Sequence, residues 1–289
     1  MKLRFCYRMI CLLAGLWGAF RPALAETPLE RGAYLVEGIA ICGNCHSPQE
    51  PSGAVPLTAL SGGPAITTPV FAAFPPNITP DRQAGIGTWT EDQVVTALRE
   101  GRTPDGRMLR PPMPVPFYRS MSDDDAHAIA AYVLSQPAVG GKTPPSQYKV
   151  PTPASYGPRV GHVAAPPRDD NIAYGAYLGS MGHCLLCHTP IGSDGQRDYA
   201  HRSGAGGLVM EGNFNRVVTA NITPDRETGL GRWTDAEVDY ALTTGQRPDG
   251  RRLAAPMPVA YLVRLTPNDR AALIAWLRSL PPIANKVVP

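Results

Sequence analysis

Hydrophobic positions recur with helical spacing in two stretches of the chain. After Thr90, the residues Val94 and Leu98 fall on one helix face, and Gln93 stands three residues after Thr90, as in a capping box. Gly101 then predicts the helix end. The second stretch has the same pattern, carried by Thr234, Glu237, Val238, Ala241, Leu242 and Gly245. Each stretch therefore predicts one amphipathic helix.

Two further pairs of helices are predicted. One pair starts at Ser122, with Asp125 at the capping-box position, and at Thr266-Pro267; Pro137 and Pro281 end these helices. Their apolar faces carry Ile129, Val133, Leu273, Trp276, Leu277 and Leu280. A shorter pair covers roughly 29–42 and 172–184. No strand-like alternation of useful length is present, so the predicted fold class is all-α.

An internal repeat organises the chain. Asn77-Ile78-Thr79-Pro80-Asp81-Arg82 recurs 144 positions later as Asn221-Ile222-Thr223-Pro224-Asp225-Arg226. The same offset relates Trp89-Thr90 to Trp233-Thr234, Pro104-Asp105-Gly106-Arg107 to Pro248-Asp249-Gly250-Arg251, and Pro112-Met113-Pro114-Val115 to Pro256-Met257-Pro258-Val259. This period is too long for a solenoid and indicates a duplicated domain.

A proline-rich segment lies between the two copies. Residues 137–170 contain eight prolines, including Pro144-Pro145 and Pro166-Pro167. Such a segment is expected to be extended and rather stiff. The prediction is two tandem helical domains, 26–136 and 171–289, joined by a linker over 137–170.

The N-terminus has the pattern of an export signal. Lys2, Arg4 and Arg8 precede an apolar run, and Ala23-Leu24-Ala25 matches a cleavage site, so we expect a signal peptide over 1–25. An uncleaved N-terminal anchor is the alternative. The segment holds four basic residues and no acidic ones, so its removal changes the formal charge from +3 to −1. Such a near-neutral chain has no basic tract that would indicate nucleic-acid binding.

The four cysteines outside this segment form two identical motifs. Cys42-Gly43-Asn44-Cys45-His46 and Cys184-Leu185-Leu186-Cys187-His188 are both C-x-x-C-H. Two thiols one helical turn apart can form thioethers to the two vinyl groups on one edge of a haem, and the adjacent histidine can then bind the iron. We therefore predict two covalently bound haem c groups, held by Cys42, Cys45, Cys184 and Cys187, with His46 and His188 as iron ligands.

Two other sites could use paired cysteines. A thioredoxin-like redox motif needs a βαβ context, which the sequence lacks. A tetrahedral zinc site could use both pairs, but the duplication assigns them to different domains.

The second iron ligand is expected to be a methionine. Small c-type haems commonly combine histidine with methionine. Met113 lies 67 residues after His46 and Met257 lies 69 after His188, both in a Pro-Met-Pro setting. A methionine is more generally a core filler, but repetition at equivalent positions favours ligation. Met108, Met121, Met181, Met210, His127, His162, His183 and His201 lack an equivalent in the other copy and are interpreted as non-ligands.

The ordered motifs resemble a known family. The succession C-x-x-C-H, N-I-T-P-D, G-x-W-T, D-G-R, M-P and a terminal helix is similar to the class I-like cytochrome c domains of dehydrogenase-associated multihaem cytochromes. The cytochrome subunits of membrane-bound alcohol and aldehyde dehydrogenases look most similar, although they carry three such domains. The resemblance implies that the segments around Asn77 and Asn221 border the haems. It makes Trp89, Trp233, Arg107 and Arg251 candidates for contacts with the haem edges or propionates. In the alternative interpretation, the two tryptophans only pack at a helix start and the two arginines belong to turns.

Electron transfer is the function these features favour. We expect a periplasmic cytochrome rather than an enzyme, free or held on the membrane by a partner. A dehydrogenase would be the donor, and an oxidase, a quinone-linked complex or another cytochrome the acceptor. A dihaem peroxidase-like oxidoreductase and a gas-binding haem module are the alternatives, and both need an open iron site.

Overall fold

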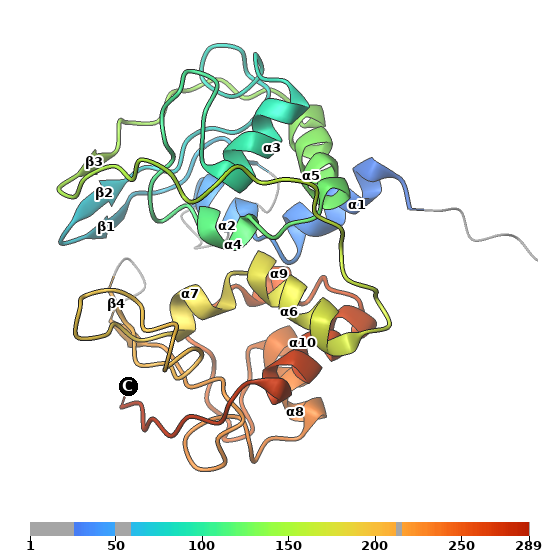
Figure 1. The fold of residues 1–289 in the computed structure, drawn as a ribbon, viewed down its shortest axis with the longest axis vertical. Helices are drawn as coiled ribbons and strands as arrows, with labels where there is room; N and C mark the ends of the chain where they lie inside the picture. Colours follow the sequence, from blue (N-terminus) through green and yellow to red (C-terminus); the bar gives the residue numbers. More distant parts are fainter. Residues whose placement is uncertain (1–25, 50–58, 212–215, 289) are drawn as a thin grey trace, which may run out of the picture.

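The computed structural model describes residues 26–49, 59–211 and 216–288 (Figure 1). The predicted signal peptide, residues 1–25, lies outside these ranges. We call residues 26–136 the first half and residues 171–288 the second half. The helices of the first half are α1 (Pro28–Glu37), α2 (Cys42–His46), α3 (Glu91–Glu100), α4 (Val115–Tyr118) and α5 (Asp123–Ser135). Those of the second half are α6 (Asn171–Met181), α7 (Cys184–His188), α8 (Asp235–Thr244), α9 (Val259–Leu262) and α10 (Pro267–Ser279).

The helix ends follow the expected local chemistry. Thr90 caps α3, and both bonds of its capping box with Gln93 are present, at 3.3 and 2.9 Å. Thr234 caps α8 in the same way with Glu237. Gly101 ends α3 in the left-handed region, with φ 71°, which glycine adopts without steric cost. The helical prediction is therefore confirmed here from cap to cap.

The predicted helices at 29–42 and 172–184 are shorter than expected. Helix α1 ends at Glu37 and α6 at Met181, and each cysteine motif forms a separate short helix. Ile41 and His183, just before these short helices, have left-handed backbone conformations with φ 44° and 40°. This turn redirects the chain, so α2 and α7 do not continue the preceding helix.

Five short strands accompany the helices in the described ranges. They are β1 (Ile66–Thr68), β2 (Phe71–Ala73), β3 (Gln147–Tyr148), β4 (Val209–Met210) and β5 (Val217–Val218). β1, β2 and β3 form an antiparallel sheet in that order, and β4 pairs with β5. The sequence does not predict these strands, because segments of two or three residues are too short to show alternation.

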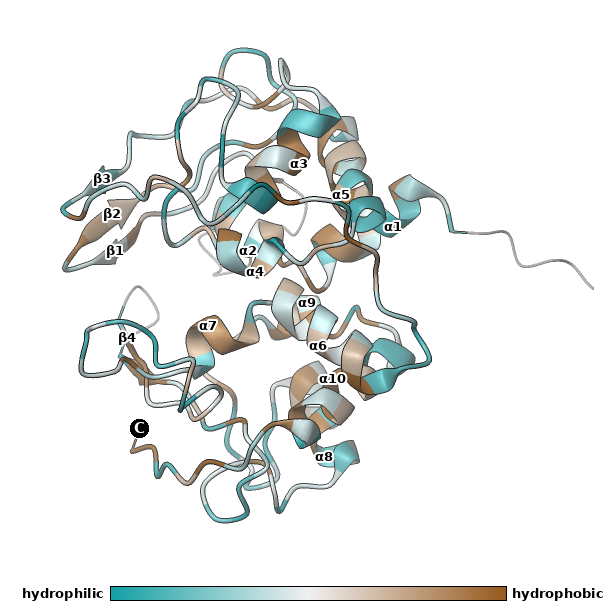
Figure 2. Ribbon diagram, viewed as in Figure 1, coloured by the Kyte–Doolittle hydropathy of each residue, from teal (hydrophilic) through white to brown (hydrophobic). Residues whose placement is uncertain are grey.

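Helix α1 packs against α5, and α6 packs against α10. The core is one connected cluster that draws buried residues from both halves, among them Leu35, Ile129, Leu178 and Leu273. Figure 2 shows hydrophobic residues on α6, α7 and α10, and a hydrophilic outer end of α8. Helices α2 and α4 lie on the side of the first half that faces α7 and α9 (Figure 1).

Residues 137–170 contain no helix and run along the first half. β3 pairs with β2 there, and the Tyr156 hydroxyl donates to the Leu109 carbonyl at 2.8 Å. Further along, Arg99 donates to the Gly161 carbonyl at 2.9 Å. These contacts fix the segment to the first-half surface over much of its length.

Candidate functional site

The first C-x-x-C-H motif forms helix α2. Its His46 Nδ1 lies 2.8 Å from the Pro76 carbonyl oxygen, so this nitrogen carries the proton and donates it. Burial lowers the pKa of His46, which keeps the ring neutral. The Nε2 atom is then left with its lone pair, the state in which imidazole binds iron.

The second motif, helix α7, has the same arrangement. His188 Nδ1 lies 2.8 Å from the Ala220 carbonyl oxygen, and burial likewise lowers the pKa of His188. Ala220 follows Pro76 by 144 positions, which is the offset of the sequence repeat. The carbonyls of the two histidines are held alike, by the Gly62 and Gly206 amides at 2.8 Å each. Both rings are therefore oriented by equivalent backbone contacts.

The four cysteines are free, half-buried thiols. Desolvation raises the pKa of Cys42 and Cys184 to about 12 and that of Cys45 to about 11, and it also raises the pKa of Cys187. Redox-active C-x-x-C cysteines and zinc ligands require thiolates, which depend on a lowered pKa. The raised pKa values give no support to the thioredoxin-like alternative. Within the described ranges, no group of three or more His, Cys, Asp or Glu side chains is arranged to hold a metal ion.

Met113 and Met257 occupy equivalent backbone turns. The amides of Met113 and Met257 bind the carbonyls of Arg110 and Ala254, both at 3.1 Å. Each methionine side chain is half-buried and packs on the core cluster, as do Cys42 and Cys184. Met121 and Met181 differ, because each is 2% exposed and fills the core, as the general interpretation of methionine expects.

The histidines outside the motifs engage protein groups. His127, His162 and His201 are exposed, and each lies within hydrogen-bonding distance of an aspartate: Asp92, Asp123 and Asp198, respectively. His183 differs, because it faces the other half of the chain. Its ring lies edge-on to that of Tyr118, with 6.4 Å between centroids, and desolvation lowers its pKa to about 4.

The two motifs approach each other across the boundary between the halves. Tyr118 in α4 donates to the Ala40 carbonyl at 3.1 Å, two residues before Cys42. The same tyrosine contacts His183, one residue before Cys184. Ser180 donates to the Phe117 carbonyl at 2.9 Å. Helix α4 is thus in contact with the entry to both motifs.

Comparison with known proteins identifies the family. No model of a known protein family matches the chain. It is 31% identical over 301 residues to the "Diheme cytochrome c-type" of Cereibacter sphaeroides, covering 95% of this chain and 96% of that protein. The chain belongs to the c-type cytochrome family. Covalent haem c is therefore its cofactor, and electron transfer by a cytochrome is its function.

Longer relatives are subunits of dehydrogenases. This cytochrome is 30% identical over 278 residues to the fructose dehydrogenase cytochrome subunit of Gluconobacter japonicus, covering 90% of the chain. It is also 30% identical over 311 residues to the alcohol dehydrogenase (quinone) cytochrome c subunit of Komagataeibacter europaeus, covering 98% of the chain. The chain spans 54% and 62% of the lengths of these two relatives. By their names these relatives are cytochrome subunits, and like them this chain is an electron-transfer protein rather than a catalytic subunit.

Several buried polar atoms have no protein partner and are available to a haem. Among the described residues, five such atoms occur: Nε of Arg99, Arg110, Arg197 and Arg247, and Oη of Tyr261. A haem brings carboxylates, which accept hydrogen bonds from buried guanidinium groups. Burial, Cys42 and Cys45 raise the pKa of Tyr261, which places this second-half residue near the first motif.

Arg107 and Arg251, the two arginines highlighted by the repeat, lie in exposed turns. Their side chains are 74% and 61% exposed and bind Asp105 and Asp249 within the same turn. The structure thus supports the turn-forming alternative for both. Arg110, Arg197 and Arg247 were missed because none of them is repeated: the positions equivalent to Arg110 and Arg247 are Ala254 and Thr103.

Asn77 and Asn221 serve the fold. Asn77 Oδ1 accepts from the Thr79 amide and hydroxyl at 2.8 and 2.7 Å, and its Nδ2 donates to the Val139 carbonyl at 2.6 Å. Asn221 makes the equivalent bonds to Thr223 and Ile283. The repeated segment therefore ties each loop to the chain that follows the last helix of its half.

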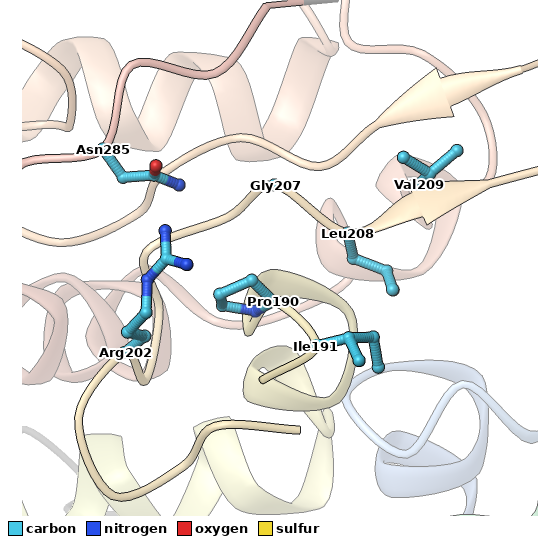
Figure 3. A pocket seen from close by; sticks show the side chains of 7 residues that line it. All are labelled: Pro190, Ile191, Arg202, Gly207, Leu208, Val209 and Asn285. Carbon is cyan, nitrogen blue, oxygen red and sulfur yellow. The ribbon is translucent and has the colours of Figure 1, made fainter. Parts of the chain in front are cut away.

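One surface cavity lies beside the second motif (Figure 3). Its volume is about 360 Å³, and it is lined by Pro190, Ile191, Arg202, Gly207, Leu208, Val209 and Asn285. None of the eight predicted haem-site residues lines it. Of the helices in the described ranges, none has both the length and the apolar character needed to cross a membrane.

Proposed function

We propose that this chain carries two haem c groups, one per half. Cys42 and Cys45 would attach the first, with His46 and Met113 as iron ligands. Cys184 and Cys187 would attach the second, with His188 and Met257 as ligands. When bound, each haem supplies an iron that cycles between the ferrous and ferric states.

The observation that carries this proposal is the equivalence of the two histidines. Both present a neutral ring whose Nδ1 is 2.8 Å from a backbone carbonyl, at positions related by the repeat. Such second-shell bonds fix the tautomer and orientation of a metal-binding histidine. Half-buried Met113 and Met257, in equivalent turns, support a closed six-coordinate iron in each half.

The proposed organisation is two tandem class I-like domains, 26–136 and 171–289, joined by the proline-rich segment 137–170. Two helix pairs support it, because α1 packs on α5 and α6 packs on α10 in the same manner. The residues after His46 and His188 also bond alike: Ser47 Oγ accepts from the Leu60 amide at 3.1 Å and Thr189 Oγ1 from the Gly204 amide at 3.2 Å.

In this proposal the protein keeps the haem sites rigid and orients their ligands. Backbone bonds hold both histidines, and a closed iron site gives electron transfer without substrate binding at the metal. We propose that a dehydrogenase donates the electrons, as the names of the longer relatives suggest. An oxidase, a quinone-linked complex or another cytochrome would accept them. The proposed location is the periplasm, reached through the predicted signal peptide 1–25.

Paired cysteine variants test the haem count. Cys42→Ala with Cys45→Ala, and separately Cys184→Ala with Cys187→Ala, should each leave a chain with one covalent haem, as measured by haem staining and pyridine haemochrome after denaturation. Retention of two haems in either variant would contradict the attachment sites.

Methionine variants test the iron ligands. Met113→Ala and Met257→Ala should each remove the sulfur–iron charge-transfer band of one haem and lower one midpoint potential. Met121→Ala is the matched control, because this methionine is buried in the core, and both bands should remain. A high-spin haem in the unmodified protein, or carbon monoxide binding to its reduced form, would instead support the peroxidase-like or gas-binding alternatives.

A further inference from the structure

A tyrosine of the first half binds the last helix of the second half. Tyr34 in α1 donates from Oη to Asp269 Oδ2 at 2.5 Å and accepts from the Thr266 amide at 3.0 Å. Thr266 is the N-cap of α10, and Asp269 is its third helical residue. One hydroxyl from α1 thus satisfies two groups at the α10 N-terminus.

The second half returns the same contact. Tyr177 in α6 donates to Asp125 Oδ2 at 2.6 Å and accepts from the Ser122 amide at 3.2 Å. Ser122 is the N-cap of α5, and Asp125 is its third helical residue. The two tyrosine contacts are therefore reciprocal.

Both tyrosines belong to a repeated segment that places them alike. Gly-Ala-Tyr-Leu occurs at 32–35 and 175–178. A Cβ at Gly32 would lie 2.1 Å from the Ala128 carbonyl oxygen, and one at Gly175 would lie 1.9 Å from that of Ala272. Each glycine lets its helix approach the last helix of its own half closely. The tyrosine two residues later then reaches the opposite half.

The tyrosines complete helix caps that would otherwise be open. In α1, α3 and α8 the third residue is glutamate or glutamine, and its side chain binds the N-cap amide directly. In α5 and α10 the third residue is aspartate, which is one methylene shorter. The tyrosine hydroxyl lies between this carboxylate and the N-cap amide and binds both. Each of these two caps is complete only with the other half in place.

The two contacts differ in charge. Asp125 is also paired with Arg31, at 2.7 and 3.0 Å, and Arg31 reaches the Tyr174 hydroxyl in the second half at 3.3 Å. Asp269 is equally buried, at 5% exposure, yet none of the ion pairs within the described ranges includes it. Tyr34 is therefore the principal side-chain donor to a buried carboxylate.

We propose that Tyr34 and Tyr177 are positioning residues that lock the two halves together and set the separation of their C-x-x-C-H motifs. Two further contacts cross the boundary: Leu265 approaches Gly38, and Ile39 approaches Gly182. These glycines lie four and two residues before Cys42 and Cys184, respectively. The consequence for electron transfer between the halves rests on the proposed function.

A distance measurement on the haem-loaded protein tests the clamp. Gadolinium(III) chelate labels at Glu91→Cys and Ala236→Cys, exposed positions on α3 and α8, would be read by pulsed dipolar EPR in the reduced state. The parent should give one narrow distance distribution. Tyr34→Phe with Tyr177→Phe should lose this narrow distribution and add longer distances.

Controls separate the clamp from general damage. Tyr156→Phe also removes a half-buried hydroxyl bond, but within the contact between 137–170 and the first half, so its distribution should stay narrow. If the double variant fails to fold, Tyr177→Phe alone, with Asp125 still paired to Arg31, should show partial broadening. An unchanged distribution in the double variant would overturn the clamp. If the double variant does not fold, an unchanged distribution in Tyr177→Phe would overturn it instead. Broadening in Tyr156→Phe to the same extent would overturn it as well. Haem content is measured separately: a parent with fewer than two haems contradicts the proposed function, not the clamp.

Discussion

Replacing Asn77 with alanine tests whether the repeated Asn-Ile-Thr segment serves the fold. Asn77 is 2% exposed and Thr79 is fully buried. The variant removes the acceptor of the Thr79 amide and the donor to the Val139 carbonyl. The Thr79 hydroxyl keeps a partner, because it accepts from the Val139 amide at 3.1 Å.

The expected loss follows from these groups. A buried amide left without an acceptor costs about 1–3 kcal/mol, and the bond to Val139 contributes about 1 kcal/mol more. The free energy of unfolding should therefore fall by about 3 kcal/mol. Urea denaturation followed by far-UV circular dichroism measures this, and Asn221→Ala should lose a similar amount in the second half.

Spectroscopy on the same variant distinguishes the two interpretations. If Asn77 serves the fold, the visible spectrum and both midpoint potentials of the folded protein stay unchanged. Asn268→Ala, at an exposed position of α10, is the control and should leave stability within about 0.5 kcal/mol. An unchanged urea midpoint together with an altered haem spectrum would refute the reasoning and favour the haem-bordering role that the family resemblance implies.

Three further variants probe other polar groups. Tyr261→Phe should lower one midpoint potential in a spectroelectrochemical titration, because the lost O–H dipole no longer stabilises the electron-rich ferrous state; two unchanged potentials would mean that this hydroxyl does not serve a haem. Hydrogen bonds, chiefly from Arg99, lower the pKa of Asp123 to about 2, so this stabilisation is present above the unfolded-state pKa near 4 and is lost as pH falls toward 2. Asp123→Asn should therefore flatten the fall of the urea midpoint over that range, and an equally steep fall would refute this. Arg31→Leu should cost about 3–5 kcal/mol by leaving Asp125 buried without its cation, and a loss below about 1 kcal/mol in urea denaturation would contradict that estimate.

Local features could be predicted from the sequence because their causes are local. The caps of α3 and α8 depend on residues three apart, and their ends depend on one glycine each. The left-handed turns at Ile41 and His183, just before α2 and α7, could not be predicted in this way. Isoleucine is β-branched and disfavours a left-handed backbone, and histidine adopts one only occasionally. The available signal was a glycine at each helix end, because Gly38 and Gly182 are the C-caps of α1 and α6.

Other features of the fold could not be predicted because they depend on contacts between residues far apart in the sequence. The capping box expected for Ser122 and Asp125 is completed by Tyr177, 52 residues beyond Asp125, and Tyr34 reaches Asp269 across 235 positions. The Gly-Ala-Tyr-Leu repeat was the available signal, and its one-residue shift relative to the other repeats concealed it.

In the candidate site, the repeated residues could be predicted from the sequence and the unrepeated ones could not. The repeat identified the eight residues proposed to hold two haems, and the structure places both motif histidines in equivalent settings. The arginines with unpartnered buried Nε atoms could not be predicted from the repeat, because they have no arginine at the equivalent position of the other half.

The proposed electron-transfer role depends on two haems being bonded to this polypeptide. The intact mass of the mature chain, after denaturation and acid-acetone extraction, tests it most directly. We predict the mass of the polypeptide plus two haem groups. A chain carrying one haem or none would contradict it.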